Sequence, residues 1–316
     1  MRLVFLGTGG AWPTKKRNVS STALIFRDKV ILVDCGEGTQ RQIHWSNFSF
    51  MKISHVLITH FHTDHFLGLF GLIESMYLNE REKPLEIIGP LGLSRLIDSL
   101  VTLGMIKNAF PIRVTEMDDG GILDIEGASV TAFVNSHGVR SLGYVIRENN
   151  RKGKFNRDKA KELGIPEGPL FGKLQRGDDI TIEEKVIVPE MVMGPPRPGR
   201  RLVFSGDTHL CPELVKQAAD ADVLVHESTY GEDMSEKAKE YKHSTAKLAA
   251  EAARDAGARY LILTHISPRY DDTAQLIMEA KKVFENTIIA EDLTEVMVPY
   301  RDSGNEITII APTGYD

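Results

Sequence analysis

The feature that most constrains this chain is the segment VLITHFHTDHFLG, residues 56–68. Its apolar run predicts a strand that ends in His60 and His62, two positions apart and therefore on the same side of an extended segment. Asp64 and His65 follow in a turn, from which they can reach a second point beyond the strand end. Histidines that cluster by chance on a solvated loop rarely follow a buried strand in this pattern. We therefore expect one short loop to contribute ligands to two metal sites.

Four ligands cannot complete two metal sites, because each zinc ion takes about four ligands. Further candidates also lie where an apolar strand meets a turn: His137 in VTAFVNSHG, Asp207 in RLVFSGDT and His265 in RYLILTHIS. Each of them alone could be a helix cap or a turn residue. Their shared placement favours metal ligation.

Size and composition indicate a soluble, folded protein. The chain has 316 residues, of which 42% are hydrophobic and 26% charged, close to the globular average. No apolar run approaches the roughly 18 residues that span a membrane, and the N-terminus does not resemble a secretory signal. We expect a cytoplasmic protein. Cys35 and Cys211 lack CxxC spacing and are interpreted as small buried apolar residues.

The charge pattern bears on a nucleic-acid partner. A net charge of -6 disfavours one, although two divalent cations would bring it to -2. The segment from Arg147 to Lys161 carries seven basic residues against three acidic ones in it and beside it. This local surplus predicts contact with a phosphate backbone; a solvated charged loop is the alternative.

The order of elements predicts one α/β body with an insertion. Gly7–Gly10 is followed by Ala-Trp-Pro instead of a helix, which excludes a dinucleotide site. Residues 147–200 differ in composition, first basic and then rich in Gly and Pro, and are interpreted as an inserted arm. We expect strands at 3–6, 22–26, 30–33, 56–59, 122–125, 130–134 and 142–146, and helices at 68–78, 91–103, 212–219 and 245–256, the last capped by Ser244.

Several motifs together resemble the metallo-β-lactamase superfamily, and specifically its tRNA 3′-end processing branch, tRNase Z of the short form. They are HxHxDH, the GDT at Asp207, the HEST at 226–229, the HST at 243–245 and the THIS at 264–267. Two more are similar to this branch alone: the PxKxRN loop at 13–18 and the GxPxGP element at 164–169. The resemblance implies an αββα sandwich over residues 1–316, two mixed sheets face to face with helices outside and residues 147–200 as a tRNA-binding arm.

The resemblance also implies the metal ligands, two Zn²⁺ per subunit and the activity. One zinc would be held by His60, His62 and His137, a second by Asp64, His65 and His265, and Asp207 would bridge both. The implied activity is endonucleolytic removal of the 3′ trailer from precursor tRNA, with a 3′-hydroxyl left on the tRNA and a 5′-phosphate on the trailer.

The residue types suit this chemistry. Two cations would provide a metal-bound hydroxide as the nucleophile of an in-line displacement, and Asp64 could orient the attacking water. His243, in a polar turn before a helix, is the candidate general acid for the departing 3′-oxygen, with Glu227 to hold it protonated. A surface histidine at a helix start is the alternative interpretation of His243. His44, His55, His209 and His226 are interpreted as packing or turn residues, although His226 could brace the metal ligands.

Candidate RNA contacts fall in two segments. Lys15, Lys16, Arg17 and Asn18 form a loop expected beside the metals, and a plain basic turn is the alternative. In the arm the candidates are Arg151, Lys152, Lys154, Gly168 and Pro169, with Leu170 and Phe171 as an apolar anchor.

The rival functions come from two classes. One is another hydrolase on the same scaffold, a thioesterase or a small phosphodiesterase, which would not need the basic arm. The other is a noncatalytic RNA-binding metal module, which would tolerate loss of His243. The resemblance implies precursor tRNA as the partner and a homodimer, with no membrane association.

Overall fold

The computed structural model describes residues 1–107 and 109–312. The chain forms two compact units. The first, here called the body, comprises Met1–Arg147 and the chain from Arg200 onward, and the second, here called the inserted unit, comprises Glu148–Gly199. Among the described residues, no helix is long and apolar enough to cross a membrane.

The first sheet of the body is mixed. Adjacent strands of this sheet are antiparallel from β17 to β3 and parallel from β3 to β6. In spatial order the strands are β17 (Thr308–Ile310), β16 (Glu295–Met297), β1 (Arg2–Gly7), β2 (Ser21–Phe26), β3 (Lys29–Val33), β4 (Ile53–Leu57), β5 (Leu85–Gly89) and β6 (Ile112–Glu116).

The second sheet is mixed as well. It is parallel from β15 to β12 and antiparallel between β12 and β9 and between β8 and β7. Its strands in spatial order are β15 (Thr287–Ile289), β14 (Leu261–Thr264), β13 (Val223–Glu227), β12 (Arg201–Phe204), β9 (Leu142–Glu148), β8 (Ala128–Val134) and β7 (Ile122–Ile125).

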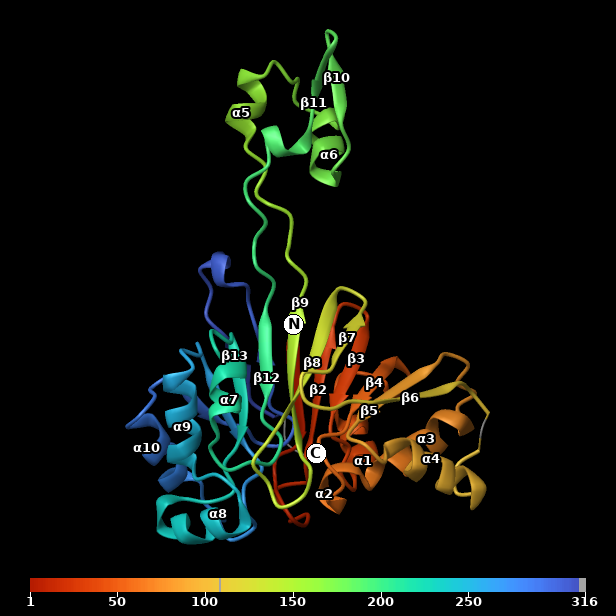
Figure 1. The fold of residues 1–316 in the computed structure, drawn as a ribbon, viewed down its shortest axis with the longest axis vertical. Coiled ribbons are helices and arrows are strands. Elements are labelled where there is room, and N and C mark those ends of the chain that lie inside the picture. The colour runs from red at the N-terminus through yellow and green to blue at the C-terminus, as the bar shows by residue number, and fades with distance from the viewer. Residues whose placement is uncertain (108, 313–316) are drawn as a thin grey trace. The chain divides into compact units, whose positions relative to one another are not determined.

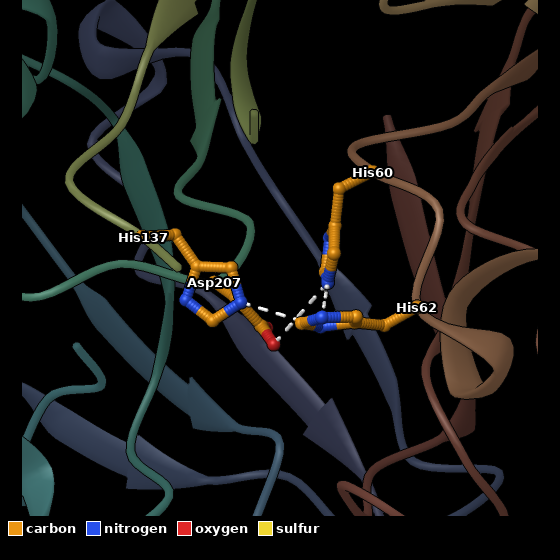
Figure 2. A group of neighbouring side chains, drawn as sticks. All are labelled: His60, His62, His137 and Asp207. Atoms are coloured by element: carbon orange, nitrogen blue, oxygen red, sulfur yellow. Dashed lines mark hydrogen bonds and ion pairs between the residues drawn. The ribbon is translucent and has the colours of Figure 1, made fainter. Parts of the chain in front are cut away.

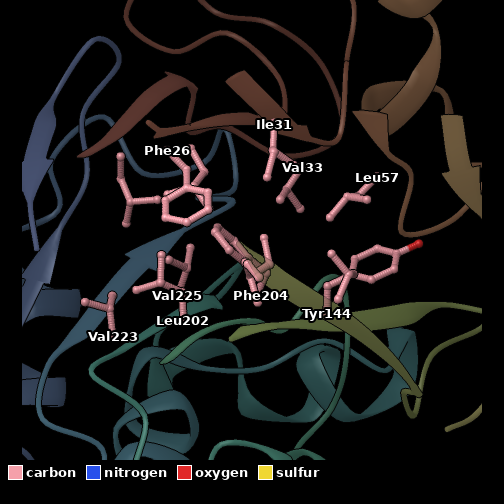
Figure 3. Close-up of a cluster of buried hydrophobic side chains, with 14 of the residues drawn as sticks. Phe26, Ile31, Val33, Leu57, Tyr144, Leu202, Phe204, Val223 and Val225 are labelled. Carbon is pink, nitrogen blue, oxygen red and sulfur yellow. The ribbon is translucent and has the colours of Figure 1, made fainter. Parts of the chain in front are cut away.

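A hydrophobic core fills the space between the two sheets (Figure 3). This core forms because successive side chains of a strand point to opposite faces of its sheet. In β12, Leu202 and Phe204 face the other sheet, whereas Val203 faces the helices. Burial of one such side chain contributes roughly 1.5–3 kcal/mol. Tyr144 is fully buried in this core, and its hydroxyl donates to the carbonyl of Ile58 at 2.6 Å. That bond ties the second sheet to the start of the histidine loop.

Helices cover the outer face of each sheet, as Figure 1 shows for the body. Against the first sheet pack α1 (Thr39–Trp45), α3 (Gly68–Leu78) and α4 (Leu93–Thr102), and against the second α7 (Pro212–Gln217), α9 (Ala246–Asp255) and α10 (Ala274–Lys281). The predicted αββα sandwich of two mixed sheets is confirmed. Shorter elements are α2 (Thr63–Phe66), α8 (Ser235–Tyr241), and the 3-10 turns Phe50–Lys52, Pro189–Met191, Glu232–Met234 and Arg301–Ser303.

Two local expectations were wrong. The N-cap of α9 is Thr245, whose hydroxyl accepts from the N–H of Leu248, and not Ser244, whose hydroxyl donates to the carbonyl of Thr208. The interpretation of both cysteines as buried holds for Cys35 and not for Cys211, which is partly exposed. Predicted boundaries otherwise differ by a few residues, the largest shift being in β4, which begins and ends before the expected 56–59.

The inserted unit contains structure that its composition did not predict. It has the helices α5 (Arg157–Glu162) and α6 (Pro169–Arg176) and a hairpin of β10 (Ile180–Ile182) and β11 (Lys185–Ile187). A small core of its own includes Phe171 and Leu174, with Leu170 packed partly against it. Leu170 and Phe171, which we expected to anchor the arm, therefore pack in the core of the inserted unit itself.

Candidate metal centre

The candidate ligands extend from both sheets, and each follows the end of a strand. His60 and His62 come after β4, and Asp64 and His65 lie in the short helix α2. The second sheet contributes the others: His137 follows β8, Asp207 follows β12 and His265 follows β14. The inter-sheet core thus holds the two halves of the centre together.

The candidate ligands converge in two adjoining groups, and within each group the ligand atoms lie within 4.8 Å of one another. A third group of this kind, Asp207, His243 and His265, overlaps both. The first group is His60, His62, His137 and Asp207 (Figure 2). In it His62 Nδ1 lies 2.9 Å from His60 Nε2 and 3.3 Å from His137 Nε2. These three nitrogens point at one another and not at separate donors, which is the arrangement that a shared cation requires.

The second group consists of Asp64, His65 and His265. His265 Nε2 lies 3.2 Å from His65 Nε2 and 3.4 Å from Asp64 Oδ2. Asp207 adjoins both groups, since its Oδ2 lies 3.6 Å from His60 Nε2 and 3.3 Å from His65 Nε2. The structure therefore brings together all seven residues that the sequence predicted as ligands.

The electrostatics suit a divalent cation. Burial holds the pKa of His60 well below 6.5, so its imidazole is neutral and keeps a free lone pair. Burial alone would raise the pKa of Asp207, but the charges of His265 and His65 outweigh it and hold the pKa well below 3.8. His60 and Asp207 are thereby in the protonation states that bind metal. Burial would also lower the pKa of His65, but the charges of Asp207 and Asp34 outweigh it and hold that pKa well above 6.5, so this imidazole would lose its proton when it binds a cation.

Two threonine–carboxylate pairs orient the imidazoles from behind. The Thr59 hydroxyl donates to Asp34 Oδ2 at 2.9 Å and lies 3.0 Å from His60 Nδ1. The hydroxyl of Thr229 likewise donates to a carboxylate, that of Glu227, at 2.6 Å and lies 2.9 Å from the Nδ1 of a ligand, His265. Each hydroxyl therefore accepts from Nδ1–H, which leaves Nε2 for a cation.

Asp34 is a site residue that the sequence analysis missed. Its carboxylate accepts from His65 Nδ1 at 2.7 Å and from the N–H of Thr59 at 2.8 Å, and it is buried. It adopts a φ of 60°, which a residue other than glycine rarely does. The signal was present in VILVD, an acid directly after an apolar strand, as for Asp207.

His243 and Glu227 form the predicted pair. Glu227 is buried, and its Oε1 accepts from His243 Nδ1 at 2.7 Å. Burial would lower the pKa of His243, but the charge and hydrogen bond of Glu227 outweigh it and raise the pKa from 6.5 to about 9. His243 Nδ1 also lies 3.9 Å from Asp207 Oδ2, so a protonated imidazole adjoins the ligand groups. This is the placement that a proton donor needs.

Two family models match segments of the chain. The model described as anti-Pycsar protein Apyc1 matches residues 1–158, and the one described as beta-lactamase superfamily domain matches residues 190–266. The ribonuclease Z of Methanosarcina acetivorans is 45% identical over an alignment that covers 95% of this chain and 99% of that protein. The chain belongs to the ribonuclease Z family.

Other ribonuclease Z relatives agree. That of Myxococcus xanthus is 46% identical, with 96% of this chain and 99% of that protein covered. The crystal structure of human tRNase Z, short form, superposes with a TM-score of 0.69 at 28% identity and covers 95% of this chain and all of that one. The resemblance inferred from the motifs, the metallo-β-lactamase fold and a hydrolytic endoribonuclease are thereby confirmed.

In this ribonuclease Z family member, the basic residues of the loop 13–18 differ in exposure. Lys15 and Lys16 are exposed. Arg17 turns inward, where its Nη1 donates to Thr8 Oγ1 at 2.6 Å and to the carbonyl of Ala290 at 2.7 Å. The N–H of Asn18 donates to the buried carboxylate of Asp292 at 2.6 Å. Arg17 and Asn18 thus hold the loop from inside. The two lysines are at the surface, where Lys16 Nζ donates to the carbonyl of Asp271 at 3.0 Å.

Asp292 is the second site residue that the sequence analysis missed. It is 5% exposed and accepts from the N–H and hydroxyl of Thr8 and from the side chain of Gln42. Burial raises its pKa to about 6 against the opposing hydrogen bonds of Asn18 and Thr8. Like Asp34, it follows an apolar strand, β15.

The candidate RNA contacts of the inserted unit also differ among themselves. Lys154, Gly168 and Pro169 are exposed, and Pro169 is the first residue of α6. Lys152 Nζ donates to the carbonyls of Gln175, at 3.3 Å, and Arg176 at the end of α6. Arg151 forms a backbone bridge with Arg197. Lys152 and Arg151 therefore have roles in holding the unit together.

The remaining histidines contact groups outside the two ligand sets. His44 is exposed and packs edge-on against Phe50, and His55 Nδ1 lies 2.8 Å from Ser54 Oγ. His209 Nδ1 donates to the carbonyl of His243, and His226 Nδ1 to that of Glu227. These are the packing and turn contacts that the sequence predicted.

Proposed function

We propose that this chain is a zinc-dependent endoribonuclease that removes the 3′ trailer from precursor tRNA, leaving a 3′-hydroxyl on the tRNA and a 5′-phosphate on the trailer. One observation carries the proposal: two adjoining His/Asp groups share Asp207, and the protonated His243 lies beside them, in a chain of the ribonuclease Z family. Imidazole and carboxylate ligands suit zinc.

The proposed metal ligands are those expected from the sequence. Within the groups described above, His60, His62 and His137 would hold one zinc ion, Asp64, His65 and His265 the second, and Asp207 both. Bound divalent cations supply Lewis-acid chemistry and lower the pKa of a coordinated water. The chain's own contribution is to fix the seven ligand atoms and to keep Asp207 ionised.

His243 is the proposed proton donor. The departing ribose 3′-oxygen needs a proton, and an imidazolium with a raised pKa remains charged at neutral pH. Glu227 orients the ring and is itself fixed by three donors, the N–H of Thr208 and the N–H and hydroxyl of Thr229. Asp64 Oδ2 accepts from the N–H of Ala11 at 2.6 Å, which orients this carboxylate toward its ligand group and the attacking water.

Recognition of the tRNA is assigned to the exposed basic residues. Lys15 and Lys16 would contact RNA near the metal centre, and Lys154 in the inserted unit would contact the phosphate backbone. Arg17, Asn18, Arg151 and Lys152 would act by shaping these surfaces, and Gly168–Pro169 by presenting the start of α6. We also propose that the protein is a homodimer and acts in the cytoplasm, and this part of the proposal rests on the family resemblance alone.

The test is cleavage of a 3′-extended precursor tRNA by the purified chain, with chelator and with zinc added back. A variant lacking residues 150–180 and a small phosphodiester substrate accompany it. We expect chelator-sensitive cleavage of the tRNA that the deletion abolishes, two zinc ions per chain by metal analysis, and hydrolysis of the small substrate by both proteins. Fast hydrolysis of a thioester or phosphodiester without tRNA cleavage would contradict the tRNA assignment.

A further inference from the structure

A cavity of about 400 Å³ adjoins the metal centre. Four candidate ligands (His62, Asp64, Asp207 and His265), together with His243, form part of its wall. Aromatic side chains form another part, namely Trp12, Phe61 and Tyr230. The reacting phosphate would therefore lie in a space that also presents aromatic surface.

The loop that carries Trp12 packs directly against two candidate ligands. A Cβ atom on Gly10 would lie 2.4 Å from Cε1 of His265, so only glycine allows this approach of the backbone to the ring. The next residue, Ala11, donates its N–H to Asp64 Oδ2 at 2.6 Å. The position of Trp12 is thus set by contacts with the same side chains that would bind the metals.

The backbone at Trp12 is fixed on both sides. Its N–H donates to the carbonyl of Gly10 at 2.9 Å, which closes a tight turn around Ala11. Ala11 adopts a φ of 66°, a conformation that a residue other than glycine takes up only when its surroundings impose it. Pro13 follows and restricts Trp12 to an extended conformation. The backbone that carries this large aromatic side chain is therefore fixed.

Trp12 nevertheless contributes little to the packing of the body. It is 58% exposed, although burying such a ring would be strongly favourable. An exposed indole on a fixed backbone at the wall of a site offers a flat surface to a partner. In a ribonuclease the flat partner is a nucleobase, and base–aromatic stacking is a common means of holding single-stranded RNA.

The surroundings allow an RNA chain to cross the centre. Arg269 and His243 line both this cavity and a second one of about 540 Å³, which Lys237 and Lys242 also line. Lys237 and Lys242 beside the second cavity suit phosphates, although Glu240 and two tyrosines also line it. Trp12 lines the first cavity and not the second. A strand whose scissile phosphate lies at the metals would place one flanking nucleotide at each cavity.

We propose that Trp12 stacks on the base of a nucleotide that flanks the cleaved bond and thereby contributes to substrate specificity. This proposal rests on the proposed function. The nucleotide is either the last one of the tRNA or the first one of the trailer, and the chemistry of recognition is the same for both.

A double-mutant cycle between protein and RNA tests the stacking. Trp12→Ala, Trp12→Phe and wild type would each be measured on an intact precursor and on precursors that are abasic at one or the other flanking position. We expect Trp12→Ala to lower kcat/KM on the intact precursor on the order of 10-fold, and Trp12→Phe to lower it less. On the precursor that lacks the stacked base, Trp12→Ala should cause almost no further loss.

The matched control is Trp45→Ala, because Trp45 is the other tryptophan, is 43% exposed and belongs to α1. It should behave as wild type on all three precursors. The proposal would be overturned if the two effects were independent. In that case Trp12→Ala would lower kcat/KM by the same factor on both abasic precursors as on the intact precursor. Zinc content and thermal unfolding of each variant establish that it is folded.

A binding measurement separates this proposal from the proposed function. In a Trp45→Phe, His243→Ala variant, Trp12 is the sole tryptophan and cleavage is slow, so its fluorescence reports binding. We expect quenching by the intact precursor that is lost with the base-deleted one. Equal quenching by both, or none, would overturn the stacking. Failure of wild type to cleave any precursor would contradict the proposed function instead, and the fluorescence would still decide the stacking.

Discussion

The metal centre and the inserted unit differ in how accurately the fold must position their functional side chains. The centre draws its ligands from residues 60 to 265, and each follows a strand whose side chains pack in the inter-sheet core. In the inserted unit six of the basic residues lie on the short helix α5 and its approach, and the others lie on α6, on β11 and at Arg197. Most of them are exposed, over a core of a few side chains. Chemistry at a phosphate requires fixed atoms, whereas attraction to a phosphate backbone requires mainly charge.

The charges of the two regions show the same contrast. The inserted unit has ten lysines and arginines against nine aspartates and glutamates, a net charge of +1. Its ion pairs, such as Lys161–Glu167, are exposed and contribute little to stability. In the body, by comparison, Asp34, Asp207 and Glu227 are buried and each accepts from or lies against a histidine. The overall acidity of the chain therefore says little about where RNA would bind.

The largest effect is expected from Asp207→Ala. This side chain adjoins both ligand groups, so its loss should release metal and lower activity by more than the roughly 10- to 100-fold typical of outer contacts. Metal analysis and precursor cleavage measure both quantities. Asp98→Ala, at an exposed position of α4, is the control. Full zinc content in Asp207→Ala would remove Asp207 from the ligand set.

His243→Ala should leave two zinc ions bound and lower turnover on the order of 100-fold, the usual contribution of a general acid. Turnover under saturating precursor and metal content are the measurements. His44→Ala, at the exposed end of α1, should change neither. Because His243 also lies near Asp207 and His265, loss of metal in His243→Ala would reassign it as a ligand.

Glu227→Gln should change the pH dependence. The proton donor must be protonated, so activity falls as pH rises through the pKa of His243, which is raised to about 9 in the wild type. Without the charge of Glu227, the burial that lowers this pKa is opposed by less, mainly by the charge of Asp207. The alkaline limb of kcat against pH should then shift to lower pH. An unshifted limb would show that Glu227 does not set the protonation of His243.

The smallest effect is expected from neutralising exposed charges in the inserted unit. Lys154→Gln with Lys159→Gln should weaken precursor binding by several-fold and reduce the slope of log K against log salt by roughly 0.7–0.9 per charge that contacts phosphate. Binding at a series of salt concentrations measures it. Lys185→Gln on β11, exposed in the same unit, controls for charge alone. An unchanged slope in the double variant would exclude Lys154 and Lys159 as phosphate contacts.

The sequence predicted best what is encoded locally. The expected helix at 68–78 and the strand at 122–125 coincide with α3 and β7, because apolar periodicity identifies them directly. The short helices α1 and α8 were missed, since helices of this length depend on tertiary packing for their stability.

At the metal centre, too, the locally encoded residues were predicted and those that depend on tertiary contacts were not. The seven ligand candidates and the pair of His243 and Glu227 were predicted, because each carries a chemically distinctive side chain after a strand or before a helix. The supporting contacts were not: the bond from Thr59 to Asp34 spans 25 positions, and that from Gln42 to Asp292 spans 250. Only the folded sheets bring such ordinary residues together.

The order of the strands has a consequence for synthesis on the ribosome. β1 lies between β2 and β16, so the first strand of the chain acquires its second neighbour only when residues 295–297 have been made. At 5–20 residues per second this takes roughly 15–60 s. Until residue 265 has been made, the nascent chain carries the histidine loop but lacks His265. A chain released before residue 265 is made therefore lacks one of the candidate ligands, and a chain released before residues 295–297 are made leaves one edge of β1 unpaired.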